Sequence, residues 1–231
     1  MKTTTKKKTT KAAPAPRTVL VLRTCNADMT SAHDGKFRWP ESGPVEAPDW
    51  LPTKACGNGL HGALKGQGEA SLLDWSESAK WLVVRVVEDS IVDLGGKVKF
   101  PRGEVIYCGD RSTAANMIAD AYPGEAVIGA TRVAGDGGTA SAGYGGTASA
   151  GYGGTASAGY GGTASAGYGG TASAGPRGTA SAGDNGIVAV RWWDDQSKRY
   201  RMAVGYVGED GIEKDVKYRY DVAAKRLVKA T

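Results

Sequence analysis

The sequence predicts a mainly β protein: a thin octapeptide β-solenoid capped at both ends, with a small α+β domain on its N-terminal side. Three observations support this fold class. Residues 134–181 divide into six consecutive octads, which read AGDGGTAS, four copies of AGYGGTAS, and AGPRGTAS. Apolar runs typical of strands flank the repeat on both sides. The apolar residues are unevenly spread, so one continuous core is not expected.

Four parts are expected: a basic tail (1–16), an N-terminal domain (17–125), the repeat (126–189) and a C-terminal cap (190–231). Six of the 29 basic side chains lie in the tail and at Arg17, and the rest of the chain then holds 23 basic and 24 acidic groups. The net charge of +5 is therefore a property of the tail. Such a segment has nothing to bury, so we expect disorder, and weak attraction to nucleic acid through its lysines.

The N-terminal domain shows four apolar segments typical of strands, followed by one helical segment. Ser112 is a candidate N-cap for that helix, and Pro123-Gly124 ends it. The helix leads almost directly into the repeat, so this domain can cap the solenoid. The expected strands cover residues 17–24, 80–87, 90–94 and 97–108, the last interrupted near Pro101, and the expected helix covers 113–122.

The repeat has two interpretations, a flexible Gly/Ser/Ala linker and a β-solenoid with one coil per octad. Small side chains bury little apolar surface, so a solenoid needs a full backbone ladder between coils about 4.8 Å apart. Gly143 and the pair Gly145-Gly146 suit tight corners with positive φ. The octads at both ends differ from the inner ones, as the terminal units of solenoids do. We favour the solenoid.

Within each octad, Thr and Ser are expected to face inward and form a partly polar core, although the opposite phase stays open. The tyrosines are too large for so narrow an interior and should form an outward ladder of rings. That ladder would contain Tyr144, Tyr152, Tyr160 and Tyr168. The predicted repeat core contains Thr139, Ser141, Thr147, Ser149, Thr155, Ser157, Thr163, Ser165, Thr171, Ser173, Thr179 and Ser181.

The C-terminal segment predicts a β-meander of three or four strands. Its apolar runs read IVAVRWW, YRMAVGYV, IEKDVKYRYDV and KRLVKA, with turn residues between them. Because IVAV follows the last octad without a break, this sheet should cover the far end of the solenoid.

Candidate chemistry is sparse. The stretch CGNGLHG (56–62) places His61 among glycines, where it suits an acid or base in a cleft. Asp110 and Arg111 form a second candidate at a strand end. For both candidates we favour a structural role, with Asp110 capping the helix. The cysteine spacings match no common zinc motif, and no cofactor or metal is expected. Three cysteines and no secretory signal predict free thiols and a cytoplasmic protein, and no apolar run is long enough for a membrane span.

A resemblance to a known group follows from RTCNADMTS, FRWPESG, APDW, CGNGLHG and KVKFPRGEVIYCGDR. These stretches resemble an uncharacterised N-terminal domain of phage and bacterial proteins that carry octapeptide repeats after it. The resemblance covers nearly the whole chain after the tail. It implies the architecture and no reaction.

The repeat is also similar, more weakly, to the AGYGST-type repeats of bacterial ice-nucleation proteins. That resemblance implies arrays of Thr-x-Thr, whereas this chain has Thr-x-Ser and six clear copies, a rod of roughly 30 Å. Such a rod is too small to order much ice, so weak ice binding is the most that it implies.

We therefore expect a non-enzymatic structural or interaction protein, which can form a homodimer through the solenoid. Two alternatives are an enzyme centred on His61 and a polyanion-binding protein that acts through the tail.

Overall fold

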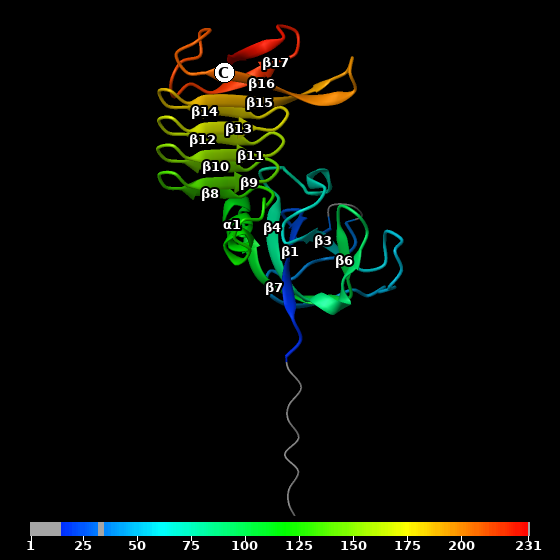
Figure 1. Cartoon of the computed structure of the whole chain (residues 1–231). Coiled ribbons are helices and arrows are strands. Elements are labelled where there is room, and N and C mark those ends of the chain that lie inside the picture. Colours follow the sequence, from blue (N-terminus) through cyan, green and yellow to red (C-terminus); the bar gives the residue numbers. More distant parts are fainter. Residues whose placement is uncertain (1–14, 32–34, 231) are drawn as a thin grey trace, which may run out of the picture.

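The computed structural model describes residues 15–31 and 35–230 of the chain. Figure 1 shows a mixed domain from which two stacks of short strands extend, ending in two hairpins near the C-terminus. The basic tail predicted at residues 1–16 lies, except for its last two residues, outside the described residues. Among those described, no helix is both long and apolar enough to cross a membrane.

The N-terminal domain contains a seven-stranded sheet in the order β2-β7-β4-β1-β3-β6-β5. The inner strand β4 reads KWLVVRVV and is buried along most of its length, as expected for a nearly continuous apolar run. Pro101 separates β6 from β7, as its place in the sequence predicted. The strands are β1 (Thr18–Cys25), β2 (Gly43–Glu46), β3 (Leu60–Leu64), β4 (Lys80–Val87), β5 (Val92–Asp93), β6 (Val98–Phe100) and β7 (Arg102–Gly109), with short 3₁₀ helices at Ala70–Leu72 and Glu88–Ser90.

Helix α1 (Arg111–Ala121) covers one side of this sheet and leads to the repeat. Its N-cap is Asp110, whose carboxylate accepts a hydrogen bond from the Thr113 amide at 2.9 Å, so Ser112 as the cap is wrong. Asp110 has extended backbone and Ser112 lies inside the first turn, where its hydroxyl cannot cap the free amides. The buried face of α1 is made of Ala114, Ala115, Ile118 and Ala119.

The repeat folds as a β-solenoid of about four turns, in which alternate strands belong to two different sheets. Thr147 pairs with Thr131 on one side and with Thr163 on the other, so equivalent residues lie sixteen positions apart. The strands are β8 (Thr131–Ala134), β9 (Thr139–Ala142), β10 (Thr147–Ala150), β11 (Thr155–Ala158), β12 (Thr163–Ala166), β13 (Thr171–Ala174), β14 (Thr179–Ala182) and β15 (Ile187–Asp194).

The prediction of one coil per octad is therefore wrong, because each coil contains two octads. One octad supplies a four-residue strand and one corner, and a single corner carries the chain only from one sheet to the other. A second octad is needed to return to the first sheet. The four strands of each stack span about 14 Å at the usual strand spacing, roughly half the predicted length.

Alanines fill the space between the two sheets, so the prediction of an inward Thr/Ser core is wrong. Both alanines of each Thr-Ala-Ser-Ala strand point inward, and Ala148, Ala156, Ala164 and Ala172 are fully buried. Methyl groups pack there without needing hydrogen-bond partners, whereas buried hydroxyls would each require one. The outward residues are the predicted core set, of which only Ser181 is buried: Thr139, Ser141, Thr147, Ser149, Thr155, Ser157, Thr163, Ser165, Thr171, Ser173, Thr179 and Ser181.

The glycines of each corner serve two different purposes. Gly145 has the predicted positive φ, at 60°. Gly143 and Gly146 do not, and they are glycine because a Cβ there would lie only 2.6 Å from the Ala126 carbonyl oxygen and 2.7 Å from that of Ala130. Close stacking of one coil on the next therefore excludes larger residues from these positions.

Both ends of the solenoid are covered. Trp75 of the N-terminal domain packs against Tyr144 with ring centroids 5.1 Å apart. At the other end the expected single meander is instead two hairpins, one on each sheet, because the last strands of both stacks offer free edges. β16 (Arg199–Tyr206) pairs with β15, and β17 (Tyr218–Asp221), which pairs with β18 (Arg226–Lys229), joins β14.

Replacing an inward alanine should destabilise the solenoid, while the adjacent outward position should tolerate the same change. Ala156→Leu forces a large side chain between the sheets and should lower the free energy of unfolding by about 1–3 kcal/mol. Ser157→Leu, the matched control in the same strand, should change it by less than about 0.5 kcal/mol. Denaturant unfolding followed by circular dichroism measures both, and equal losses would contradict the alanine-lined interior.

Candidate functional site

The outer faces of the solenoid are two regular arrays of hydroxyl and methyl groups. On the face of β10, β12 and β14, threonines pair with threonines and serines with serines in register. Hydroxyls of successive coils contact each other: Thr179 Oγ1 donates to Thr163 Oγ1 at 3.3 Å, and the Ser165 and Ser181 hydroxyls are 3.0 Å apart. The strands β9, β11 and β13 of the other face pair in the same register, threonine with threonine and serine with serine.

The four tyrosines form two stacked pairs on the two edges of the solenoid, rather than one ladder. Tyr144 stacks on Tyr160 with ring centroids 5.2 Å apart, and Tyr152 stacks on Tyr168 at 5.3 Å. Successive corners alternate between the two edges, because each octad carries the chain across the solenoid once. Every second tyrosine therefore belongs to the same column.

The two edges differ in what covers them. Tyr144 packs on Trp75, and the Arg177 guanidinium lies 5.7 Å from the centre of the Tyr160 ring. On the other edge Tyr152 is 61% exposed and Tyr168 is 48% exposed. That second edge is the more open aromatic surface.

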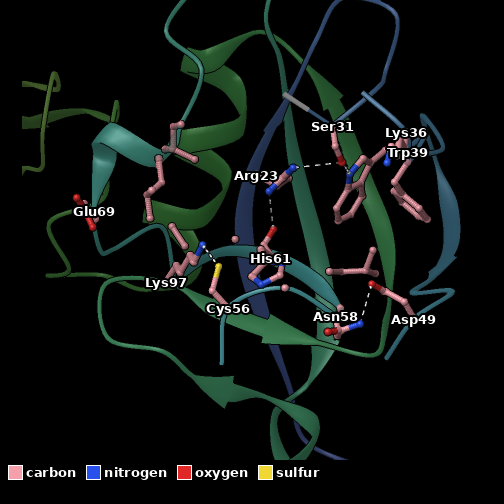
Figure 2. Close-up of a pocket in the computed structure, with 18 of the residues that line it drawn as sticks. Arg23, Ser31, Lys36, Trp39, Asp49, Cys56, Asn58, His61, Glu69 and Lys97 are labelled. Atoms are coloured by element: carbon pink, nitrogen blue, oxygen red, sulfur yellow. Dashed lines mark hydrogen bonds between the residues drawn. The ribbon is translucent and has the colours of Figure 1, made fainter. Parts of the chain in front are cut away.

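A separate cleft of about 670 Å³ lies in the N-terminal domain. Figure 2 shows that Arg23 and His61 lie in the middle of it, with the Cys56–Lys97 contact on one side and Trp39 on the other. Arg23 comes from β1 and His61 from β3, whereas Cys56 belongs to the loop before β3. This is the cleft that the CGNGLHG stretch predicted for His61.

His61 is uncharged at neutral pH. Burial, with the nearby charges of Lys97 and Arg23, lowers its pKa to about 4. Its Nε2 atom is buried and has no hydrogen-bond partner among the described residues. A base with so low a pKa is poorly matched to acid–base catalysis near pH 7.

Cys56 is the exposed thiol of the cleft. Lys97 Nζ donates a hydrogen bond to its Sγ at 3.0 Å, and this contact lowers the pKa of the exposed thiol. Burial instead raises the pKa of Cys25 to about 11 and also raises the pKa of Cys108. No sequence pattern marks Cys56 as a functional residue, because Lys97 lies 41 residues away along the chain.

Asp110 and Arg111 do not join His61 and do not line the cleft. Hydrogen bonds from Thr113 and from the Tyr107 hydroxyl lower the pKa of Asp110 to about 2, as suits its role as a helix cap. The Arg111 guanidinium lies 5.5 Å from the Trp75 ring centre. No group of three or more His, Cys, Asp or Glu side chains that could hold a metal occurs within the described ranges.

Comparisons with known proteins give two similarities. Residues 19–120, less than half of the chain, match a domain of unknown function (DUF7666). The chain is also 46% identical over 104 residues to an ice nucleation protein of Pseudomonas fluorescens, and 43% identical over 102 residues to one of Pseudomonas syringae. These matches cover 44% and 43% of this chain but only 8% and 9% of the relatives' own lengths. No solved structure matches the chain.

Removing the Lys97 amine should make Cys56 less reactive. In Lys97→Met the pKa of the thiol rises toward its ordinary value, so the thiolate fraction at pH 7 falls and alkylation by iodoacetamide slows roughly severalfold. Peptide mapping by mass spectrometry separates Cys56 from the two less reactive cysteines. Lys217→Met, an exposed lysine in the C-terminal region, is the control, and identical pH profiles in the two variants would contradict the role of Lys97.

Proposed function

We propose that this structural repeat protein binds ordered water, including the surface of ice, through the outer Thr/Ser faces of its solenoid and without catalysis. The observation that carries the proposal is the in-register alignment of identical hydroxyl residues over successive coils. The names of the relatives, ice nucleation proteins, support the same class of ligand.

The chemistry of the faces suits water that is held in a fixed arrangement. Along the stack the hydroxyls repeat at about 4.8 Å, and Thr and Ser on one strand lie about 6.6 Å apart. The backbone ladder and the alanine interior hold these positions rigid. Water bound to such a face loses little further freedom on joining an ordered layer, since its partners are already in place.

The small area of each face favours binding over nucleation. Each stack spans about 14 Å, and the chain matches only 8–9% of the length of the ice nucleation proteins compared above. In an ordered water patch of this size, a large share of the water molecules lie at the rim. We therefore propose weak binding to existing ice, with no initiation of freezing.

Charged side chains on the faces should abolish binding to ice. Thr147→Lys with Thr163→Lys changes one face, and Thr155→Lys with Thr171→Lys changes the other. We measure how much of the full chain is incorporated into a slowly growing ice crystal. In at least one of these two double variants, incorporation should fall to the level of a protein without ice affinity. Glu209→Lys, in an exposed turn away from both faces, should behave as the wild type. Exclusion of the wild-type chain from the ice would refute the proposal.

A second proposed role is self-association through the open tyrosine edge. Tyr152 and Tyr168 present stacked, half-exposed rings that a second copy can cover by the same contact, related by a two-fold axis. Aromatic residues are enriched in such interfaces because they bury a large area with little loss of side-chain freedom.

The double variant Tyr152→Ser, Tyr168→Ser should lower the average mass measured by light scattering while leaving the fold intact. Tyr160→Ser, which removes the same kind of ring from the other edge, is the matched control. If the wild type is a dimer and the wild type and both variants have the same average mass, this edge is not the interface.

The other expectations stay predictions. An enzyme centred on His61 has little support from an imidazole whose pKa is about 4. Nucleic-acid attraction through the tail concerns residues that lie almost wholly outside the described ranges. A cytoplasmic location and a phage or bacterial origin likewise remain expectations from the sequence.

A further inference from the structure

We propose that the outer face of the β15–β16 hairpin binds single-stranded nucleic acid, by stacking of the bases on its exposed aromatic rings. The inference does not depend on the roles proposed for the Thr/Ser faces or for the tyrosine edge. A contiguous patch of exposed apolar side chains marks an interaction surface. Such side chains, each between 42% and 52% exposed, gather on this hairpin: Trp193, Tyr200, Met202, Val204 and Tyr206.

All five side chains lie on the same side of the hairpin. Successive residues of a strand point to opposite faces, so the four that belong to β16, each two positions from the next, share one face. In the strand register Trp193 of β15 lies opposite Tyr200, so it belongs to the same face. On the other face, Val188 and Val190 point into the alanine cluster. The five side chains therefore point outward.

The half of the hairpin nearest its turn extends beyond the solenoid. β15 and β16 are each eight residues long, whereas the strands of the repeat have four. Ile187–Val190 pair with β13, but Arg191–Asp194 pair with β16 alone. Figure 1 shows this hairpin reaching past the stacked strands. Among the described residues no further strand continues the sheet beyond β16, so a ligand can lie across this face.

The rings offer stacking surfaces at both ends of the face. Near the turn, Trp193 and Tyr200 pack edge to face with ring centroids 5.0 Å apart, and the Arg191 guanidinium lies 4.2 Å from the centre of the Tyr200 ring. Tyr206 lies at the other end of β16, about 20 Å away at the usual rise of a strand. Bases of single strands stack on aromatic rings and on guanidinium planes. The face therefore has room for several successive bases.

The hairpin carries a net positive charge, which suits a phosphate backbone. Residues 191–206 hold four basic and two acidic side chains. Both acids lie at the turn and form ion pairs with basic residues of the hairpin itself. Arg191 and Arg199 are exposed, the first over the Tyr200 ring and the second next to it in the chain. Phosphates can therefore contact these cations while the adjoining bases stack on the rings.

The hairpin and the basic tail offer nucleic acid different contacts. Residues 1–16 contain lysines and no aromatic residue. Their charge attracts any phosphate backbone, but they give bases no ring on which to stack. A preference for a strand that carries bases over one that lacks them therefore separates the hairpin from the tail.

Fluorescence anisotropy of the full chain with two probes tests the proposal. One probe is a labelled oligothymidine of about fifteen nucleotides, and the other is an abasic phosphodiester of the same length and charge. The wild type should bind the oligothymidine about tenfold more tightly, because each stacked base adds affinity. Tyr200→Ser with Tyr206→Ser should remove this difference. Tyr152→Ser with Tyr168→Ser, the matched control at another exposed pair of rings, should keep it.

Circular dichroism spectra that match the wild type show that both double variants are folded. Equal affinities of the wild type for the two probes overturn the proposal, and so does a preference for the oligothymidine that survives the loss of Tyr200 and Tyr206. Light scattering tests for a second copy on the same face. If the Tyr200, Tyr206 double variant lowers the average mass of a dimeric wild type and keeps the base preference, the face is an interface between copies and the proposal is wrong.

Discussion

The pairing of each strand with the strand sixteen residues later is the interaction on which this molecule depends. It joins backbone amides and carbonyls of successive coils, both in the strands and at corners such as Gly145, whose amide donates to the Tyr160 carbonyl at 2.9 Å. The interior contributes only methyl groups, so apolar burial per residue is small. Stability must come largely from complete backbone pairing and from close packing, and the close packing demands glycine at the corners, where a Cβ would meet the backbone of the preceding coil.

A ladder of this kind needs both of its ends covered. The unpaired edge of a terminal coil would be a template for another chain. The N-terminal domain meets the first coil through Trp75. Val127, just after that domain, is buried in its core, and its carbonyl accepts the Gly143 amide at 3.0 Å. At the far end, Tyr218 and Ile212 extend the alanine cluster with larger side chains. The flanking segments therefore supply the apolar packing that the repeat lacks.

The outer faces of the solenoid and the cleft of the N-terminal domain differ in how their polar groups are arranged. The solenoid repeats one weak group, a hydroxyl beside a methyl, at a constant spacing, so any affinity grows with the number of coils. The cleft gathers a few strong groups once: Arg23, Lys97 and an imidazole that burial keeps uncharged. The two regions therefore differ in chemistry: one repeats a weak polar group over an extended surface, and the other gathers charged and aromatic groups in one place.

Much of the order of elements follows from the sequence alone, because local patterns govern it, but the short strands β2 and β3 of the N-terminal domain were not expected. The continuous apolar run of β4, the break at Pro101 and the positive φ of Gly145 are each encoded within a few residues. The octad also sets the alternation of strand and corner. The octad leaves two questions open: whether a strand pairs with that of the next octad or of the one after, and which side of Thr-Ala-Ser-Ala faces inward. In each case both alternatives give the same sequence period of eight residues. Only the packing of two sheets decided these points, since methyl groups fit a narrow interior without polar partners. The cleft likewise required the tertiary structure, which brings Lys97 to Cys56 across 41 residues.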